Sequence, residues 1–265
     1  MELSNSQHLL DPKTDFLRGK AAFYRAQSIL ELLDSLNRSG NALPPQLLLV
    51  TKGISAEQIK GFLQGAKKYP RFPKLLFGEN RIEELESKQS ELAIKGYEDL
   101  LWAFIGKIQS RKMERILKQC CCILSVDSNK RLMAIDACLA KLQKRCDVYL
   151  QVNVSAQPLR CGILPDSFDD EKTLQTLLEE INSLQYGKFT GLMAMASKPD
   201  DQYPHRNYHE FLKMQRIRLI LTKSLGLPIH GLELSIGMSS DFLLAILCGG
   251  SLVRLGTSIW HSPEA

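Results

Sequence analysis

The sequence predicts a single (β/α)8 barrel of the TIM type, with an extra helix before its first strand and residues 1–265 as one domain. Its 265 residues are 44% hydrophobic and 24% charged, which is typical of a globular chain that buries a large core. Eight short apolar segments alternate with longer segments that have helical spacing. Because this alternation indicates a parallel sheet covered by helices, eight repeats favour a closed barrel, with an open doubly wound sheet as the alternative.

The expected strands are short leucine-rich or β-branched runs. In chain order they read QLLLVT, KLLF, LLWAFIG, CILSVD, DVYLQVNV, FTGLMAM, GLELSIG and SLVRLGT, over residues 46–51, 74–77, 100–106, 122–127, 147–154, 189–195, 231–237 and 251–257. Their near-continuous apolar character is typical of strands that are buried on both faces.

The expected helices have apolar residues at helical spacing. One covers residues 16–37 before the first strand, and the others cover 55–69, 79–95, 110–119, 128–145, 169–185, 203–225 and 240–247. Ser55 and Gln58 have the spacing of a capping box, which predicts where the second helix begins. Glu83 and Glu84 lie near Lys88 at helical spacing, which is typical of a solvated face with i,i+4 ion pairs.

Composition argues against several classes of partner. The net charge of +5 is spread along the chain, so we expect no nucleic-acid partner. No apolar run reaches the length of a membrane span and the N-terminus has no secretory signal pattern, so we expect a cytoplasmic protein without a membrane partner. Seven cysteines without a C-x-x-C pair predict reduced thiols, and the three adjacent ones at positions 120–122 are expected to act as buried bulk. His205 and His209 lack the glutamate of H-E-x-x-H and are expected as a surface pair, so no metal is predicted.

Lys52 follows the first expected strand directly, in QLLLVTKG. In barrels of this class the carboxyl ends of the strands form the active face. A neutral lysine amine at that face can attack an aldehyde to form an imine. From position alone, the alternative is a lysine that marks where the strand surfaces.

A phosphate site is expected at the other end of the strand order. Gly237 ends the seventh strand in LSIGMSSDF, and a helix is expected to open at Ser239 or Ser240. Gly256 and Thr257 follow the eighth strand in LVRLGTSI. Taken separately, GMSS and GTS are typical of capped turns, which is the alternative. Together, their backbone N–H groups and small hydroxyls suit a phosphate, and barrels commonly use the loops after strands seven and eight. Arg254, within the eighth strand, needs a specific partner because its charge points into the barrel or its mouth.

Taken together, these segments resemble the pyridoxal phosphate homeostasis protein family, whose fold is similar to the N-terminal barrel domain of alanine racemase. The matching segments are LLLVTKG, FGENRIEE, WAFIGKIQSRK, GLMAMAS, LSIGMSSDF and VRLGTSIW, from Leu47 to Trp260. They occur in the family's order and span nearly the whole chain.

The resemblance implies a role for each matching site residue. Lys52 corresponds to the lysine that forms the internal aldimine with pyridoxal 5′-phosphate (PLP), and Asn80 to a residue beside the ring. Arg254 corresponds to the arginine near the pyridine nitrogen, where an unprotonated ring is a weak electron sink. The implied phosphate cradle consists of Ser235, Gly237, Gly256 and Thr257.

Some positions depart from the family pattern. Ala103 stands where the family has a histidine, and Arg111 where it has an asparagine. The segment LRCGI around Gly162 and the ending IWHSPEA also differ from the usual forms. These departures concern fine tuning and leave the lysine and phosphate segments intact.

The resemblance implies a PLP carrier that exchanges the cofactor with apo-enzymes in vitamin B6 and amino-acid homeostasis, without catalytic turnover and as a monomer or weak dimer. The first alternative is a PLP-dependent amino-acid racemase. In alanine racemase the second base is a tyrosine on a further β domain of the partner subunit, and that domain is expected to be absent here because the sequence stops soon after the eighth strand. The second alternative is an aldolase that forms a Schiff base with a sugar phosphate, which a lysine on the first strand disfavours.

Overall fold

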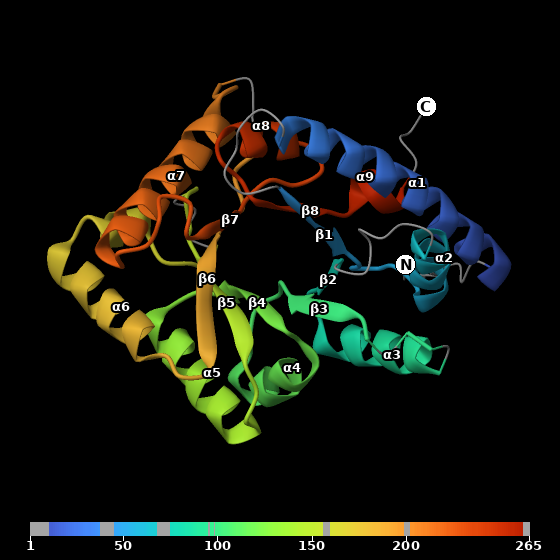
Figure 1. Cartoon of the computed structure of the whole chain (residues 1–265), viewed down its shortest axis with the longest axis horizontal. Helices are drawn as coiled ribbons and strands as arrows, with labels where there is room; N and C mark the ends of the chain where they lie inside the picture. The colour runs from blue at the N-terminus through green and yellow to red at the C-terminus, as the bar shows by residue number, and fades with distance from the viewer. Residues whose placement is uncertain are drawn as a thin grey trace, which may run out of the picture.

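Eight parallel strands form one sheet in the order β7-β6-β5-β4-β3-β2-β1-β8 (Figure 1). The computed structural model describes residues 11–37, 45–67, 75–94, 96–97, 99–155, 160–198 and 202–261. The strands are β1 (Gln46–Val50), β2 (Leu76–Glu79), β3 (Leu101–Phe104), β4 (Cys122–Val126), β5 (Cys146–Gln151), β6 (Gly187–Met193), β7 (Glu233–Ser235) and β8 (Leu252–Leu255). Every expected strand is confirmed in its place along the chain, with shifted ends. Residues 68, 69, 74 and 95 of the expected elements lie outside the described residues.

The sheet closes into a barrel through contacts between its two end strands. Ser251 N donates to Leu234 O at 2.9 Å, and Leu234 N donates to Ser251 Oγ at 2.9 Å. Arg254 N donates to Gly237 O at 3.1 Å. These bonds replace a regular ladder between β7 and β8, and Figure 1 shows the strands enclosing the barrel axis. The barrel predicted from the sequence is therefore confirmed, and the doubly wound alternative is wrong.

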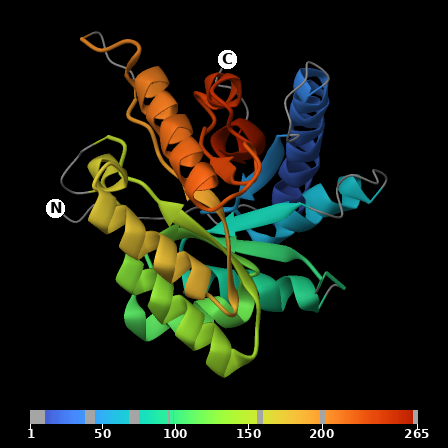
Figure 2. The ribbon, with the colours of Figure 1, turned by 60° about the vertical axis from the view of Figure 1, so that its left-hand side comes forward.

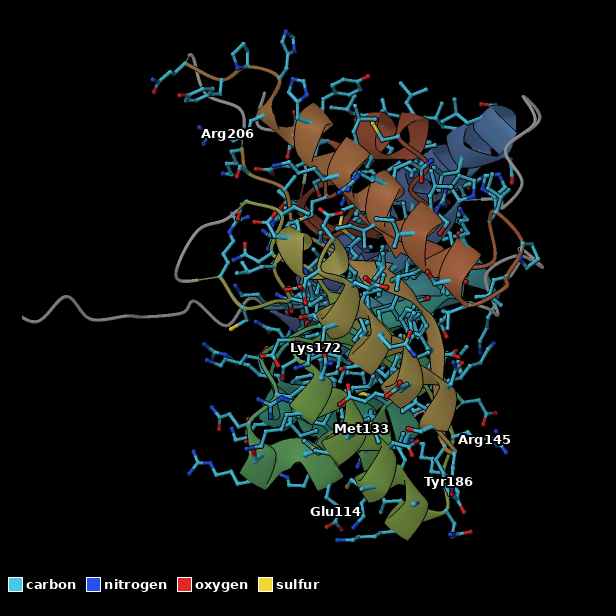
Figure 3. All side chains as sticks on the ribbon, turned by 90° about the vertical axis from the view of Figure 1, so that its left-hand side faces the viewer. Glu114, Met133, Arg145, Lys172, Tyr186 and Arg206 are labelled. Carbon is cyan, nitrogen blue, oxygen red and sulfur yellow. The ribbon has the colours of Figure 1, made fainter. Side chains whose placement is uncertain are left out.

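Helices cover the outside of the barrel. They are α1 (Pro12–Asn37), α2 (Ala56–Ala66), α3 (Ile82–Ala93), α4 (Met113–Gln119), α5 (Asn129–Leu142), α6 (Glu171–Ser183), α7 (Arg206–Ser224), α8 (Phe242–Leu247) and α9 (Thr257–Trp260), with 3-10 turns η2 (Ser110–Lys112) and η3 (Pro165–Phe168). The capping box of Ser55 and Gln58 is confirmed at the start of α2. In Figure 3 the labelled Glu114 and Arg145 lie at the outer edge of the molecule.

Most helix boundaries differ from the prediction by a few residues, and two of the differences lie directly after β2 and β7. The helix expected at Ser239 or Ser240 begins at Phe242, because Asp241 Oδ1 accepts a 2.7 Å hydrogen bond from Met238 N and holds the preceding residues in a turn. Glu79, expected as the first helical residue, is instead the last residue of β2. None of the helices in the described ranges combines the length and apolar character that a membrane crossing requires.

The N-terminal helix α1 packs against α2 and α9, and α9 in turn contacts β1. Arg25 Nε on α1 donates to Ile259 O at 2.6 Å, and Trp260 Nε1 donates to Val50 O at 2.8 Å. Ser55 Oγ donates to Asp15 Oδ2 at 2.7 Å and links α2 to α1. Figures 1 and 2 show the red C-terminal helices between the blue α1 and the orange α7. The extra N-terminal helix is thus part of the helical layer, where it packs against α2 and α9.

Buried side chains separate into two layers. The barrel interior is filled by a small cluster: Leu48, Ala103, Cys122, Leu124, Tyr149, Met193 and Leu252. The larger cluster lies between the sheet and the helices and includes Leu47, Leu49, Val253 and Leu255. Because side chains alternate along a strand, Val50 on β1 and Arg254 on β8 face the interior.

Candidate functional site

The seven residues singled out in the sequence lie at one rim of the barrel, where the strands end. They are Lys52 after β1, Asn80 after β2, Ser235 and Gly237 at and after the end of β7, and Arg254, Gly256 and Thr257 at and after the end of β8. β1 pairs with β2 on one side and with β8 on the other. The fold therefore brings both ends of the strand order to one rim, and the role of the seven as cofactor ligands stays a prediction.

Lys52 occupies the turn between β1 and α2, and its side chain is exposed. The interior-facing Val50 lies two residues before it and is the register partner of Gly78. Thr51 N donates to Gly78 O at 2.9 Å, so the main chain stays paired with β2 up to the residue before the lysine. An exposed amine delivered to the rim in this way is accessible to a carbonyl ligand.

Asn80 has a buried side-chain oxygen, Oδ1, for which the described residues supply no hydrogen bond. Its N–H donates to Glu79 Oε1 at 2.8 Å. Its carbonyl oxygen would lie 2.1 Å from a Cβ at Gly106, so the glycine permits close approach on the other side. A buried acceptor without a donor is costly, and a ligand that offers a donor at this point would remove that cost.

Arg254 is buried and crosslinks the ends of three strands. Its Nη1 donates to Ser235 O at 2.6 Å and to Ser235 Oγ at 2.8 Å, and its Nη2 donates to Ala194 O at 2.8 Å. Burial lowers the pKa of Arg254 to about 10, with the Asp241 carboxylate opposing the shift. The guanidinium is therefore still charged near neutral pH, and the specific partners expected from the sequence are neutral oxygens of β7 and of the residue after β6.

The loops after β7 and β8 contact one another. Ser258 N donates to Ser239 Oγ at 3.2 Å, and Ser258 Oγ donates to the same oxygen at 3.1 Å. Gly237 has φ +89°, and a Cβ there would lie 2.6 Å from Ala245 Cβ, so only glycine fits. Thr257 is exposed beside this junction. Small residues, hydroxyls and backbone N–H groups thus converge where the sequence predicted an anion site.

Ser239 and Ser258 were not among the predicted ligands, although both lie in the segments GMSS and GTS that suggested the phosphate site. Neither segment shows by itself which hydroxyl faces the other loop. That relationship depends on the barrel closing, which brings residues 19 positions apart into contact.

The position of Lys88 differs from the one expected from its helical spacing with Glu84. The residue was expected on a solvated helix face, but its side chain is only 8% exposed and its Nζ lies 2.5 Å from Oε2 of the fully buried Glu79. Nζ also donates to Thr51 O at 2.8 Å. Glu84, the partner at i,i+4 spacing, is more distant at 3.7 Å. The reason is tertiary: α3 packs over the end of β2, where the Glu79 carboxylate needs a buried cation.

The departures from the family pattern have different surroundings. Ala103 is fully buried in the barrel interior with Leu48 and Cys122. Arg111 is exposed and donates to Gln109 Oε1 at 3.4 Å. The substitution of alanine for the family's histidine at position 103 therefore changes the barrel interior, whereas Arg111 changes only the surface.

Two of the three adjacent cysteines are buried as expected, and the histidine pair lies at the surface. Cys120 and Cys122 are buried and Cys121 partly so, and burial raises the pKa of each thiol. High thiol pKa values make these groups poor nucleophiles near neutral pH. His205 and His209 are exposed, as a surface pair should be.

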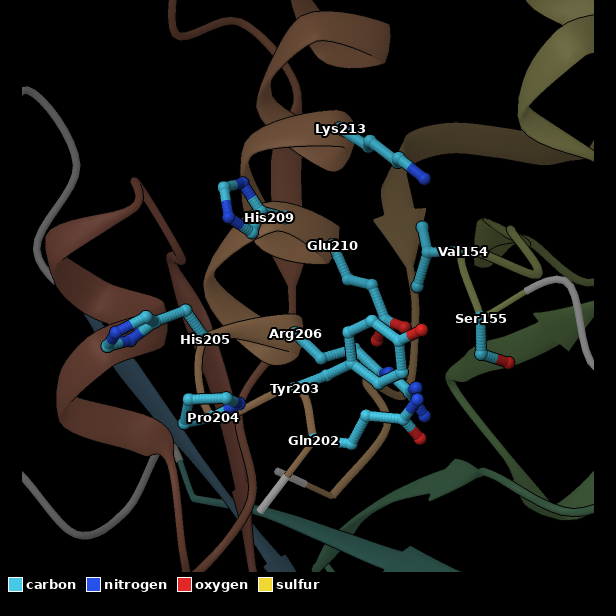
Figure 4. Close-up of a pocket in the computed structure, with 10 residues that line it drawn as sticks. All are labelled: Val154, Ser155, Gln202, Tyr203, Pro204, His205, Arg206, His209, Glu210 and Lys213. Atoms are coloured by element: carbon cyan, nitrogen blue, oxygen red, sulfur yellow. The ribbon is translucent and has the colours of Figure 1, made fainter. Parts of the chain in front are cut away.

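A cavity of about 560 Å³ opens between the segment after β5 and the start of α7 (Figure 4). In Figure 4 the side chains of Tyr203 and Glu210 point into it, with Ser155 on the opposite wall. The Glu210 carboxylate is held by Ser197, whose N and Oγ donate at 2.6 and 2.9 Å. None of the seven predicted residues lines this cavity, which opens after the carboxyl ends of β5 and β6.

The rim as a whole suits one kind of ligand. It combines an accessible amine, a buried amide oxygen without a donor, a buried guanidinium and two joined loops rich in hydroxyl and backbone N–H groups. Such a set can hold a small molecule that has both a carbonyl group and an anionic group. Among the described residues, no cluster of side chains suited to a metal ion is present.

Comparison with known proteins gives consistent matches. Residues 76–263 match the family of the alanine racemase N-terminal domain. A pyridoxal phosphate homeostasis protein from Schizosaccharomyces pombe is 31% identical over 238 residues, which cover 89% of this chain and 92% of the relative. The structure of PipY from Synechococcus elongatus with PLP bound has a TM-score of 0.69 and 30% identity, and the match covers 88% of this chain and 100% of PipY.

An alanine racemase from Clostridium difficile is similar in fold alone. Its TM-score is 0.57 at 17% identity, and the match covers 83% of this chain and 52% of the racemase chain.

Proposed function

The chain belongs to the pyridoxal phosphate homeostasis protein family, which shares the alanine racemase N-terminal domain, and from this premise we propose that it binds PLP at the rim that carries Lys52. PipY, which is 30% identical, has been solved with PLP bound. When bound, PLP supplies an aldehyde that condenses with an amine and a pyridine ring that withdraws electrons. Lys52 is the proposed covalent partner, through an imine.

The observation that carries the proposal is the buried Oδ1 of Asn80, for which the described residues offer no donor. It lies beside the strand that delivers Lys52 to the same rim. A hydroxyl group on an aromatic ring is the kind of donor that this oxygen lacks. The polar groups of the rim thus fit PLP better than an apolar ligand.

The other residues have complementary roles in the proposal. The loops that carry Gly237, Gly256 and Thr257 hold the phosphate through backbone N–H groups and the threonine hydroxyl. Arg254, fixed by Ser235 and Ala194, presents a charged donor to the pyridine nitrogen and leaves that nitrogen unprotonated. An unprotonated ring withdraws electrons weakly, which favours storage of the cofactor over turnover.

We therefore assign the protein to PLP and amino-acid homeostasis, with cofactor exchange toward apo-enzymes and without catalytic turnover. The names of its relatives, which are pyridoxal phosphate homeostasis proteins, support the part of this assignment that concerns PLP homeostasis. A cytoplasmic location, a monomeric or weakly dimeric state and a single domain over residues 1–265 belong to the same proposal.

The test is covalent fixation of the bound cofactor. The purified protein is incubated with PLP, reduced with borohydride and digested, and mass spectrometry locates the pyridoxyl group. We expect it on Lys52 in the parent protein and in Lys107→Ala, a matched variant of an exposed lysine shortly after β3. A pyridoxyl group fixed on another lysine, or on none, would overturn the proposal.

A further inference from the structure

A buried ion pair lies directly behind the rim that carries Lys52. Lys88 Nζ on α3 is 2.5 Å from Glu79 Oε2 at the end of β2, and the two side chains are 8% and 0% exposed. Both Glu79 oxygens are engaged, because Asn80 N donates to Oε1 at 2.8 Å and Thr51 Oγ1 lies 3.2 Å from Oε2. The pair is therefore fully satisfied inside the protein.

The ion pair is on the outer side of the barrel wall. Phe77 packs in the layer between sheet and helices, whereas a Cβ on Gly78 would meet the interior residue Leu48. Alternation along β2 then directs Glu79 outward, toward α3, which carries Lys88. A ligand at the barrel mouth therefore meets neither side chain, and any effect of the pair on that ligand is indirect.

Hydrogen bonds connect the pair to the main chain at two rim residues, Lys52 and Asn80. Lys88 Nζ donates to Thr51 O at 2.8 Å, and this carbonyl belongs to the peptide group that leads into Lys52. On the other side, the Glu79 carboxylate accepts from the N–H of Asn80. One ammonium and one carboxylate thus connect the main chain at both positions.

Stability alone is a weak reason for such an arrangement. Removing two charges from water costs about as much as their attraction returns, and apolar replacements of similar volume are often equally stable. Unlike apolar contacts, the hydrogen bonds of an ion pair are directional. They therefore fix the orientation of the peptide groups that the pair contacts.

We propose that Glu79 and Lys88 are a positioning pair that holds Lys52 and Asn80 in the relative orientation needed for covalent attachment of the cofactor. The inference rests on the proposed function. The pair fixes the peptide group between Thr51 and Lys52 relative to Asn80. The aldehyde of the bound cofactor then meets the Lys52 amine in a reactive orientation. Neither Glu79 nor Lys88 exchanges a proton with the ligand.

The test separates positioning from stability with four variants, one of which is the conservative change Lys88→Arg. Lys88→Met leaves the buried Glu79 charge without its cation. The double variant Glu79→Gln/Lys88→Met is neutral and similar in volume, and it keeps an acceptor for Asn80 N while losing the bond to Thr51 O. Lys118→Met, which breaks an exposed ion pair with Glu114, is the matched control. For each protein we would measure the urea unfolding midpoint and the rate of covalent attachment at saturating PLP.

We expect Lys88→Met to lower both the midpoint and the attachment rate, the latter by about tenfold or more. The neutral double variant should regain most of the midpoint but keep the slow rate, and Lys88→Arg should regain part of the rate. If the double variant regains rate and midpoint together, the pair is merely structural and the inference is wrong. Parental attachment in Lys88→Met would also overturn it. Should Lys88→Met not fold, the double variant decides alone.

A second readout needs no cofactor. In the ligand-free double variant, amide hydrogen exchange should be faster in peptides that contain residues 51–53 and 80, and unchanged in peptides from α5 and α6. Unchanged exchange at the rim would overturn the inference even if PLP binds as proposed. If the rim loosens but the parent protein fixes no pyridoxyl group on Lys52, the proposed function fails instead.

Discussion

The hydroxyl group of Tyr149 on β5 donates a 2.6 Å hydrogen bond to Glu233 Oε2 on β7. Gly191 on β6 is the register partner of both residues, so no side chain separates them. Burial raises the pKa of Glu233, and the hydrogen bond from Tyr149 opposes that shift. Burial also raises the pKa of Tyr149 far above its usual range, so the phenol stays a donor.

This pair predicts a pH dependence of stability. The pKa of Glu233 is raised in the folded state. The contribution of the protonated carboxyl group to the free energy of unfolding is therefore fully present below the pKa of the unfolded state, and it is lost as pH rises through the pKa of the folded state. From about pH 4 to about pH 7, the unfolding free energy of the parent should therefore fall relative to that of Glu233→Gln. Urea denaturation at several pH values measures this. Glu114→Gln, whose carboxyl pKa is instead lowered by Lys118, should show the opposite sign or no change.

Removing the amine of Lys52 separates covalent attachment from phosphate affinity. In Lys52→Ala the visible band of the bound cofactor should vanish, while the loops after β7 and β8 still offer donors to the phosphate. Weak noncovalent binding should survive in equilibrium dialysis. A band that persists in Lys52→Ala would mean that another lysine carries the cofactor.

Thr257→Val should give the reverse result. The band still forms, but the phosphate loses one charge-assisted hydrogen bond, worth about 1.5 to 3 kcal/mol or roughly ten- to a hundredfold in affinity. Transfer to an excess of a PLP-accepting apo-enzyme would report the loss as faster release. The control is Thr176→Val on the exposed face of α6, which should release at the parental rate.

Amino-acid racemisation should stay far below ordinary enzyme rates. Chiral analysis of alanine and serine incubated with the PLP-loaded protein provides the measurement. Sustained turnover on the order of one per second or faster would refute the non-catalytic assignment and favour the racemase alternative.

Gly237→Ala should destabilise the protein more than Gly226→Ala does. Both glycines have positive φ, but a Cβ at Gly237 would lie 2.6 Å from Ala245 Cβ, whereas nothing lies within 4 Å at Gly226. The backbone cost of about 1 to 2 kcal/mol applies to both, and only Gly237 adds a clash of about 1 to 3 kcal/mol. Equal urea midpoints for the two variants would contradict this account.

The barrel could be predicted from the sequence because local patterns determine it. Apolar runs and helical spacing indicated eight alternating repeats, and Ser55 with Gln58 marked the start of α2. Lys52 was recognisable because a charged residue after a buried strand must surface at the rim. Helix α9 was not anticipated, since it has only four residues and no side-chain cap.

The relationships between elements could not be predicted. The helical spacing of Glu84 and Lys88 suggested a surface pair, but the position of α3 over β2 gives Lys88 a nearer partner in Glu79. Likewise, the buried oxygen of Asn80 without a donor depends on how the chain around Gly106 packs. Such features follow from tertiary packing, which overrides local preference.

The bond from Trp260 to the carbonyl of Val50 joins residues 210 positions apart, and it ties the C-terminal helix to the first strand. On the ribosome, residues 46–52 therefore emerge long before the segment that completes their surroundings. A nascent chain that lacks β8 can present the Lys52 amine, but the barrel beside that amine is still open between β1 and β7. Contacts of such long sequence separation form late in folding, so we expect loading with a ligand at this rim to follow the synthesis of β8 and α9.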